Sequence, residues 1–586
     1  MSSPLRTASY DKSPEICVQG FDHAACEGWE TIARTLLQKI TQRTATRTVL
    51  VIDCYPGVDL TELQNHLIQL LPASLIVDAD QAKRPEGEVH TLIKRNLTDD
   101  RVFGVISCHQ LEEFFDSEKI SEIQAKINAA EGLVVVFGPG AALISRGDIL
   151  VYADLARWEI QQRYRRGELG NWGVNNVNED ILRRYKRAFF VEWRVFDRHK
   201  TPLLKSADFI LDTNRPQHPV MVSGEAFDAG LRQTTARPFR VVPFFDPGVW
   251  GGQWMKRQFD LDPEAPNYAW CFDCVPEENS LLMRFGNVRV EIPSQDLVLL
   301  YPQALLGEKV HARFGAEFPI RFDFLDTIGG QNLSCQVHPL TEYIQQNFGM
   351  HYTQDESYYI LAAEPDAEVY LGTKTGVVPQ AMLGELRAAQ RGEKAFDDEK
   401  FINRFPAKAH DHFLIPAGTV HCSGAGTMVL EISATPYIFT FKLWDWGRLG
   451  LDGLPRPVHL EHGEQVIDWQ RDTAWVQSHL INHIEPMAQG KGWREERTGL
   501  HEREFIETRR HWFSEAVDHH TEGRVNVLNL VQGDEAIVES PDHCFEPFTV
   551  HYAETFIVPA AVGAYRIRPV HPDGKTLATL KAWVRG

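Results

Sequence analysis

The stretches FLIPAGTVHCSG (413–424) and FIVPAAVGAYRI (556–567) share the frame F-[LI]-[IV]-P-A, and this repeat decides the fold class. Each reads as strand, turn and strand, and each follows an acidic residue, Asp411 or Glu554. From about residue 240 onward short strands and turns dominate, except for a helical stretch at 381–405. Two strand-rich modules with one shared signature predict two β-barrels of the jelly-roll type.

The first copy of the repeat carries a candidate metal ligand, His421, whereas the second has Ala564 at the matching position. Upstream, Gln336 and His338 lie two apart in LSCQVHP, so both project from one face of a strand. Glu356 begins the next strand candidate. Two imidazoles, a carboxylate and an amide oxygen suit Zn²⁺, with Fe²⁺, Mn²⁺ and Co²⁺ as alternatives. Each residue alone is more often an ordinary core or rim residue, so the prediction depends on the set, and it places a metal only in the first barrel.

The N-terminal third, from about 46 to 215, alternates apolar β-branched runs with helical patterns, which predicts an α/β domain with a parallel sheet. The strands we expect are TVLVIDC (48–54), SLIVDA (74–79), FGVIS (103–107), GLVVVFG (132–138) and ADFILDT (207–213). A helix is expected over 153–167, and its arginines Arg157, Arg163, Arg165 and Arg166 are predicted to form a solvated face rather than a phosphate-binding lid.

The first of these strands continues into DCYPGVDLTEL, which has the place and length of a phosphate-binding loop. The four positions that carry glycines, lysine and a hydroxyl in a working loop are Cys54, Asp59, Leu60 and Thr61. The lysine is missing, and a carboxylate would repel phosphate. The segment resembles P-loop nucleoside-kinase-like domains, and we interpret it as a degenerate relative that binds no nucleotide.

Composition narrows the possible partners and the compartment. The chain of 586 residues has 60 Lys+Arg against 80 Asp+Glu, a net charge of −20, which argues against nucleic acid and anionic membranes as partners. Nine scattered cysteines indicate a reducing compartment, so we expect a cytoplasmic protein. The Cys271–Cys274 pair has no second pair at zinc-ribbon spacing.

Several motifs together resemble the class I, cupin-type mannose-6-phosphate isomerases. LSCQVHP, DESYYIL and FLIPAGTVHCSGAGTMVLEI are similar to that family's metal-site runs, and PFFDPGVWGGQW, FPIRFDFLDT and LWDWGRLGLDGLPRPVH to its other motifs. The resemblance covers about 240–586. It implies a single Zn²⁺ held by Gln336, His338, Glu356 and His421, and interconversion of mannose 6-phosphate and fructose 6-phosphate.

Two positions depart from the family's pattern. The family's strand lysine corresponds to Asp323, although Arg321 shares that strand face. The family's arginine in Y-R-x-x-D-x-x-R corresponds to Lys442 when counted back from Arg448, or to Phe441 when counted forward from the metal histidine. Because lysine and arginine are not interchangeable at a bidentate site, the substrate could differ from mannose 6-phosphate.

The expected chemistry moves a proton between C1 and C2 of a sugar through a cis-enediol(ate). Glu431 is the candidate base or hydroxyl-positioning group, and Lys442 would contact the sugar oxygens or the intermediate. Arg448 and Arg321 are candidate phosphate ligands, and Asp445 is expected to orient one of the cations. Alternatives are an isomerase for another sugar phosphate, a different cupin enzyme such as an iron dioxygenase, and a non-catalytic sugar-phosphate-binding protein.

The expected domains are a degenerate kinase-like α/β domain (1–215), a catalytic cupin domain (216–475) with a helical insertion at about 378–406, and a second, metal-free cupin domain (476–586). The oligomeric state is left open.

Overall fold

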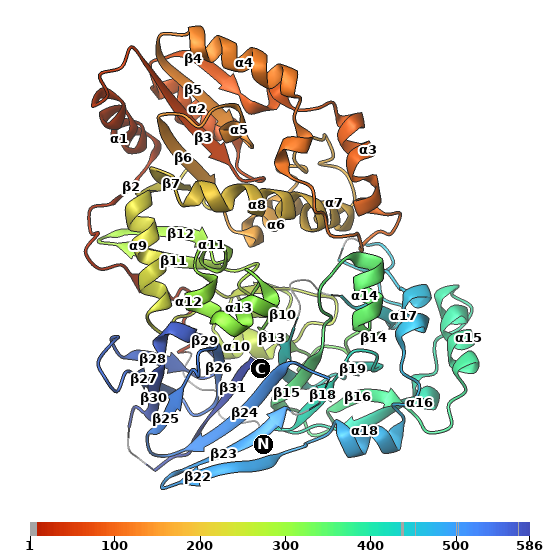
Figure 1. The fold of residues 1–586 in the computed structure, drawn as a ribbon. Helices are drawn as coiled ribbons and strands as arrows, with labels where there is room; N and C mark the ends of the chain where they lie inside the picture. The colour runs from red at the N-terminus through yellow and green to blue at the C-terminus, as the bar shows by residue number, and fades with distance from the viewer. Residues whose placement is uncertain (1–8, 435–438, 452, 500, 502, 572–573) are drawn as a thin grey trace. The chain divides into compact units, whose positions relative to one another are not determined.

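The structure is a computed structural model that describes the chain except residues 1–8, 435–438, 452, 500, 502 and 572–573. The chain forms two compact units. The N-terminal unit contains residues 15–234 and 278–301, and the C-terminal unit contains residues 1–14, 235–277 and 302–586. Figure 1 shows the elements of both. In the part of the chain described, no helix is long and apolar enough to cross a membrane.

The N-terminal unit is built on a seven-stranded sheet of order β2-β8-β7-β6-β3-β5-β4. Its strands are β2 (Ala25–Glu27), β3 (Arg47–Cys54), β4 (Ala73–Asp78), β5 (Gly132–Gly138), β6 (Ile149–Asp154), β7 (Phe209–Asp212) and β8 (Val220–Ser223). The five strands from β4 to β7 in this order are parallel, as predicted. The central strand β3 is buried from its second residue on, which explains its continuous apolar run.

The helices of this unit lie between and around these strands. They are α1 (Trp29–Thr41), α2 (Leu60–His66), α3 (Glu86–Leu97), α4 (Ser117–Ala129), α5 (Ala141–Ile144), α6 (Arg157–Arg165), α7 (Ile181–Arg187), α8 (Trp193–Leu204) and α9 (Gly224–Thr235). A π-helical segment, Ala188–Glu192, joins α7 to α8.

One predicted strand is wrong and one was missed. The stretch FGVIS (103–107) is not a strand, because its amides bond elsewhere: Val105 N donates to Asn96 O of α3, and Ser107 N donates to Phe190 O of the π-helical segment. The strand that was missed is β6, a member of the parallel sheet. Its last two residues lie inside the stretch from residue 153 that we assigned to a helix. An apolar run alone does not say whether helices or a sheet will cover it.

The prediction of a solvated arginine face is also wrong for two of the four arginines. Arg157 and Arg163 are each only 3% exposed. Arg157 pairs with Asp197, and Arg163 donates to the carbonyls of Gly57 (2.8 Å) and Thr213 (2.6 Å). These arginines therefore hold the loops at the carboxyl ends of the parallel strands.

The N-terminal unit extends past the predicted boundary at 215 and takes back a segment from later in the chain. β8 pairs antiparallel with β7, so the sheet is complete only after residue 223. Residues 278–301 supply β11 (Ser280–Phe285), β12 (Val288–Pro293) and α11 (Gln295–Leu300), and β1 (Glu15–Cys17) pairs with β11. Asp296 of α11 forms an ion pair with Lys200 of α8 at 2.6 Å, which ties this segment into the unit.

The first barrel of the C-terminal unit has two antiparallel sheets. The six-stranded sheet, in order, is β18 (His412–Ile415), β15 (Glu356–Ala363), β20 (Thr427–Ser433), β13 (Arg321–Asp326), β10 (Trp270–Cys274) and β9 (Phe244–Asp246). The five-stranded sheet is β17 (Ile402–Pro406), β16 (Glu368–Thr373), β19 (His421–Ser423), β14 (Cys335–Val337) and β21 (Phe441–Trp444). The expected helical insertion is present as α15 (Pro379–Gln390) and α16 (Asp398–Phe401).

Other helices of this unit are α10 (Trp254–Gln258), α12 (Pro302–Leu306), α13 (Glu308–Phe314), α14 (Thr341–Phe348), α17 (Leu460–Val466) and α18 (Thr473–His479).

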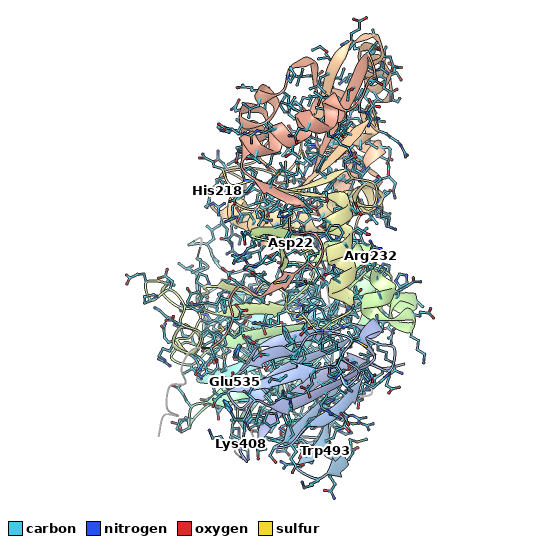
Figure 2. All side chains as sticks on the ribbon, turned by 90° about the vertical axis from the view of Figure 1, so that its left-hand side faces the viewer. Asp22, His218, Arg232, Lys408, Trp493 and Glu535 are labelled. Carbon is cyan, nitrogen blue, oxygen red and sulfur yellow. The ribbon has the colours of Figure 1, made fainter. Side chains whose placement is uncertain are left out.

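The second barrel repeats the double-sheet arrangement. One sheet is β22 (Glu485–Gly490), β23 (Trp493–Gly499), β24 (Ile506–Phe513), β31 (Leu577–Val584), β26 (Asn526–Gln532) and β29 (Thr555–Val558). The other is β25 (Val517–His520), β30 (Ala564–Pro569), β27 (Glu535–Glu539) and β28 (Phe548–His551). An apolar core lies between the sheets and includes Phe513, Leu528 and Tyr565, with Trp493 packed against it. Figure 2 labels Trp493 and Glu535 on these strands.

Candidate metal centre

Three strand ends of the first barrel bring four polar side chains together. Gln336 lies within β14, and His338 follows that strand directly before Pro339. Glu356 is the first residue of β15, and His421 is the first residue of β19. Gln336 and His421 are cross-strand partners, so their side chains project from the same face.

The two histidines converge on one carboxylate. His338 Nε2 lies 3.0 Å from Glu356 Oε2, and His421 Nε2 lies 2.8 Å from Glu356 Oε1. Gln336 Nε2 lies 3.2 Å from His421 Nε2. His338, Glu356 and His421 form a group whose potential ligand atoms all lie within 4.8 Å of one another, and all three are buried.

The other ring nitrogen of each histidine fixes the direction of its lone pair. His338 Nδ1 bonds the Phe439 carbonyl at 2.8 Å, and His421 Nδ1 bonds the Thr419 carbonyl at 2.8 Å. A carbonyl only accepts, so each Nδ1 carries the proton and each Nε2 of a neutral ring presents a lone pair. This tautomer is the one that metal-ligating histidines adopt.

Two lone pairs aimed at a carboxylate repel unless a cation lies between them. Among the described residues, neither His338 Nε2 nor Glu356 Oε1 has a partner in hydrogen-bonding geometry, although both are buried. Burial raises the pKa of Glu356, but the charge of the two imidazoles in their protonated form outweighs it and brings that pKa well below its usual value; with neutral rings, a bound metal ion would supply this positive charge. The residues therefore fit a divalent cation, and the nitrogen and oxygen donors are those that Zn²⁺, Fe²⁺, Mn²⁺ and Co²⁺ accept.

An acidic group lies beside this cluster. Glu431 of β20 is the cross-strand partner of Asp323 on one side and of Tyr358 on the other. Gln354 Nε2 donates to both Glu356 Oε2 (2.9 Å) and Glu431 Oε1 (3.3 Å). Gln354 and Tyr358 were not predicted, but their spacing of two from Glu356 would have placed all three on one strand face.

These carboxyl groups resist ionisation. Burial, and then the charges of Asp323 and Glu356, raise the pKa of Glu431 well above its usual value. Burial raises the pKa of Asp323 to about 6, while the nearby Arg321 guanidinium lowers it. Arg321 therefore lies with Asp323 and Glu431 on the inner face of β13 and β20, as the sequence predicted from parity.

The remaining predicted residues divide between two places. Lys442 of β21 is a cross-strand partner of Gln336, so it projects from the same face as the ligand cluster. Arg448 instead binds Asp445, and its Nη1 donates to Asn332 O at 2.7 Å. Asp445 also pairs with Arg456, a residue that we did not predict. The expectation that Asp445 orients a cation is confirmed, but Arg448 contacts no residue of the ligand cluster in these bonds.

The second barrel can be compared position by position. Glu356 pairs with Ile415 and Asn526 pairs with Val558, and these two partners occupy the same place in the repeated F-[LI]-[IV]-P-A frame. Asn526 therefore matches Glu356. Two residues further along each strand, Tyr358 pairs with Glu431 and Leu528 pairs with Lys581, so Lys581 matches Glu431.

Two further matches follow from the same pairing. Asp323 is the cross-strand partner of Glu431, and Arg509 is the cross-strand partner of Lys581, so Arg509 matches Asp323. Two residues earlier on each strand, Glu507 matches Arg321. The inward-facing residue after the turn is Tyr565, one residue beyond the predicted Ala564, because Tyr565 belongs to the core. Its hydroxyl donates to Asn526 Oδ1 at 2.9 Å.

Comparison with known proteins shows the family to which the chain belongs. The fold and site define a double-barrel protein with a two-histidine, one-carboxylate cluster. The chain is 26% identical to the mannose-6-phosphate isomerase of Streptococcus mutans over 221 residues, which is 37% of this chain and 64% of that protein. It is 30% identical to the mannose-6-phosphate isomerase ManA of Bacillus subtilis over 235 residues, 40% of this chain and 69% of that protein.

The chain belongs to the mannose-6-phosphate isomerase family. The match spans 64% of the Streptococcus mutans relative, so it leaves part of that protein unmatched. Among solved structures, the mannose 6-phosphate isomerase of Bacillus subtilis aligns with a TM-score of 0.47 at 18% identity, over 59% of this chain and 99% of that one. Residues 28–236 match a family model described as a domain of unknown function, DUF8485.

Proposed function

We propose that the chain is a metal-dependent aldose–ketose isomerase that interconverts mannose 6-phosphate and fructose 6-phosphate in the first barrel. The observation that carries this proposal is the convergence of His338, Glu356 and His421 with their Nε2 lone pairs and carboxylate directed at one point. Membership of the isomerase family supports the same reaction class. Gln336 would complete the ligand set. A divalent ion held there, Zn²⁺ in our proposal, would stabilise negative charge on adjacent sugar oxygens.

The residues beside the ligands supply the proton transfer and orientation in this proposal. Isomerisation breaks the C–H bond at one of C1 and C2 and forms one at the other, through a cis-enediol. Glu431, beside the ligand Glu356 through Gln354, either takes and returns that proton or orients a sugar hydroxyl. Lys442 neutralises charge on the sugar oxygens from the neighbouring strand. Arg321 is the preferred candidate phosphate ligand, because its strand β13 pairs with the Glu431 strand β20, whereas Arg448 is already bound to Asp445.

A related sugar phosphate is the second candidate substrate. Asp323 stands where the family has lysine and Lys442 where it has arginine, so two cationic contacts of the family differ in this chain. Arg321 shares the strand face of Asp323 and keeps one positive charge there, but its guanidinium would reach a different part of the substrate. These differences favour a changed sugar or a changed phosphate position over a change of reaction class.

A direct assay tests the proposal. Purified full-length protein should convert fructose 6-phosphate in a coupled assay, lose activity with a chelator and regain it when a divalent metal is added back. A panel of aldose and ketose phosphates run in parallel separates mannose 6-phosphate from the alternatives. Protein that holds metal by elemental analysis and binds sugar phosphates without turnover would instead identify a sugar-phosphate-binding protein.

For the N-terminal unit, we propose a degenerate kinase-like domain that transfers no phosphate. Asp59 caps α2, and its Oδ1 accepts hydrogen bonds from Thr61 N (2.9 Å) and Glu62 N (3.0 Å). These amides are the type of group that would cradle a phosphate. Lys200, a buried cation near the strand ends, is already paired with two carboxylates, Asp154 and Asp296.

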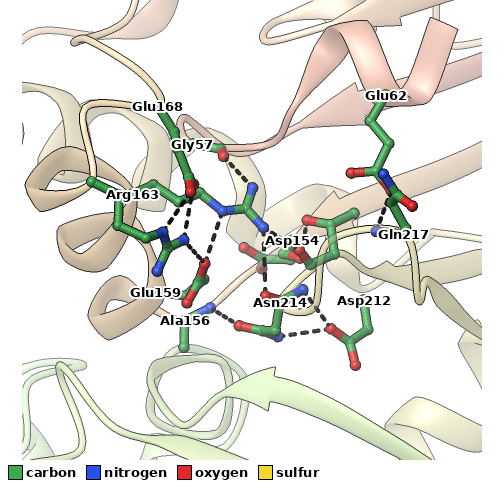
Figure 3. A network of polar contacts seen from close by, with 12 residues as sticks. Gly57, Glu62, Asp154, Ala156, Glu159, Arg163, Glu168, Asp212, Asn214 and Gln217 are labelled. Atoms are coloured by element: carbon green, nitrogen blue, oxygen red, sulfur yellow. Dashed lines mark hydrogen bonds and ion pairs between the residues drawn. The ribbon is translucent and has the colours of Figure 1, made fainter. Parts of the chain in front are cut away.

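The loops that follow the parallel strands in this unit are bonded to polar side chains of the same unit. Figure 3 shows Arg163 and Asn214 joined to the backbone and carboxylates around them. Asn214 Nδ2 donates to Asp212 Oδ1 at 2.8 Å, and Asn214 Oδ1 accepts from Ala156 N at 2.8 Å. Titration of the full chain with ATP–Mg²⁺ and GTP–Mg²⁺ should give no saturable heat. Micromolar binding of either nucleotide would contradict this part of the proposal.

A further inference from the structure

A cavity separate from the metal centre lies in the C-terminal unit, beside α18 and the first strands of the second barrel. It has a volume of about 690 Å³, a size typical of small-molecule sites. Its polar lining combines three arginines and three histidines with two glutamates, and Trp475 and Ser478 complete the wall. These residues are Arg497, Arg503, Arg585, His479, His483, His501, Glu485 and Glu507.

The lining is positive in a chain that is strongly negative. Three arginines against two glutamates give a formal charge of +1 before any histidine is protonated, whereas the whole chain has a net charge of −20. Glu507 is shared by Arg497 (2.8 Å), Arg585 (3.0 Å) and Arg509 (3.1 Å), so one carboxylate compensates three guanidinium groups, although Arg497 also lies 3.6 Å from Glu485. An anion that enters the cavity therefore meets a local excess of positive charge.

Arg503 is the cation best placed to bind a ligand. Its side chain is 53% exposed, and its carboxylate contact is a long one, 3.5 Å from Asp468 Oδ2. Arg585, in contrast, also donates to the carbonyls of His501 (3.2 Å) and Gly499 (3.1 Å) and is held in place. The site thus has one cation, Arg585, held by backbone carbonyls directly after β31 and one exposed cation, Arg503, from a neighbouring loop.

The three histidines of the lining differ in how their ring nitrogens are bonded. His483 Nε2 is buried and has no hydrogen-bond partner among the described residues. His479 bonds through Nδ1 to Trp475 O at 2.9 Å, while its ring stacks on Trp475 with centroids 4.6 Å apart. Burial, and then the charges of Arg471 and Arg503, lower the pKa of His501 to about 4. An anion would relieve this crowding of positive charge.

We propose that this cavity binds the phosphate group of a small phosphate monoester, as a second ligand site distinct from the metal centre. Arginine forks and imidazole N–H groups are the usual donors to phosphate oxygens, and the cavity has room for a sugar-sized remainder. The proposal does not depend on the isomerase reaction, because none of its residues belongs to the metal cluster.

Isothermal titration of the full chain with inorganic phosphate tests the site. The variants are Arg503→Gln and, as a matched control, Arg494→Gln, an arginine that is 55% exposed and paired with Glu496 at 3.2 Å on the opposite face of β23. We expect wild type and R494Q to bind phosphate equally and R503Q to bind about tenfold more weakly, the usual effect of losing one charge-assisted hydrogen bond. Equal binding by R503Q and R494Q, or no saturable binding by wild type, would overturn the proposal.

Two additional arms identify the binding site and the anion. The titration is repeated with the His421→Ala variant after chelator treatment, where binding should persist because the cavity is independent of the metal. Loss of phosphate binding in that variant would assign the phosphate to the metal centre and overturn the inference. Acetate at matched ionic strength should not compete, and competition at equal concentration would show a carboxylate site instead of a phosphate site.

Discussion

The two barrels of the C-terminal unit share a strand arrangement but carry opposite charges at matching positions. Asp323 and Glu431 of the first barrel are matched by Arg509 and Lys581 in the second. Arg321 is matched by Glu507, so the sign changes at three paired positions. The framework of paired strands fixes where side chains stand, and the charges placed there decide which ligand each barrel can accept.

The same comparison shows why the side chains at the matching place in the second barrel call for no ion. In the first barrel His421 Nε2 lies 2.8 Å from Glu356 Oε1. A ring lone pair and a carboxylate oxygen this close repel each other unless a cation lies between them. In the second, the Tyr565 hydroxyl donates to Asn526 Oδ1 at 2.9 Å. A neutral donor and a neutral acceptor satisfy one another, so that pair needs no further partner.

The largest effect expected from this comparison comes from removing one ligand. His421→Ala should abolish metal binding and lower isomerase activity by about 10³-fold or more, because charge stabilisation worth several kcal/mol is lost. Its counterpart, Tyr565→Phe, should leave activity unchanged and cost about 1 kcal/mol of stability through one lost hydrogen bond. Coupled assays, elemental analysis and thermal unfolding measure these effects. An H421A variant that still binds metal and stays active would contradict the assignment of His421 as a metal ligand.

A smaller effect is expected from changing one charge beside the ligands. Asp323 raises the pKa of Glu431, so Asp323→Asn should lower it. If Glu431 acts as a base, activity present above its pKa should extend to lower pH, with the acidic limb of the pH–rate profile moving down by about one pH unit. Arg509→Gln, the matching change in the second barrel, should leave the profile in place. A profile that D323N does not shift removes Glu431 as the titrating base.

The smallest effect concerns stability of the second barrel. Burial lowers the pKa of Lys581 to about 8, below its unfolded value, so its charged form disfavours folding at neutral pH. This cost is fully present below pH 8 and disappears as the pH rises through the unfolded pKa, about 10.4. Lys581→Met should therefore stabilise the protein by about 1–2 kcal/mol at pH 7 and by much less at pH 10.

The control for this change is Lys491→Met, whose side chain is 88% exposed in the same barrel. Chemical unfolding at both pH values measures the difference. A gain for K581M that is equal at pH 7 and pH 10 would mean that improved packing, not charge burial, is responsible.

The sequence predicted the ligand cluster better than its surroundings. Gln336 and His338 are two apart on a strand, and His421 follows a proline-glycine turn in the repeated frame, so local rules place all three near strand ends. Glu356 joins them because β15 pairs with β18, a pairing that the sequence analysis did not predict. The role of Arg448 was harder to predict. Its guanidinium group binds Asp445, and this contact depends on the geometry of a turn, which the alternation of side chains along a strand does not describe.

The N-terminal unit shows where local rules fail. FGVIS has strand composition, yet its amides bond to a helix and a π-helical segment instead of a sheet. Arg157 and Arg163 lie on a helix with a mean hydropathy that suits solvent, yet loops fold over them. The deciding contacts of Ser107, Arg157 and Arg163 come from residues 40 or more positions away, which no short window contains.

The path of the chain between its two units has a practical meaning for the gene. Residues 1–14 belong to the C-terminal unit, and residues 278–301 return to the N-terminal one. A truncation that removes residues 1–215 would therefore leave β11 without its partner β1 and would remove Tyr10, which hydrogen-bonds Asp273. During synthesis, the first unit cannot be completed until residue 301 has left the ribosome, so we expect the two units to require expression as one chain.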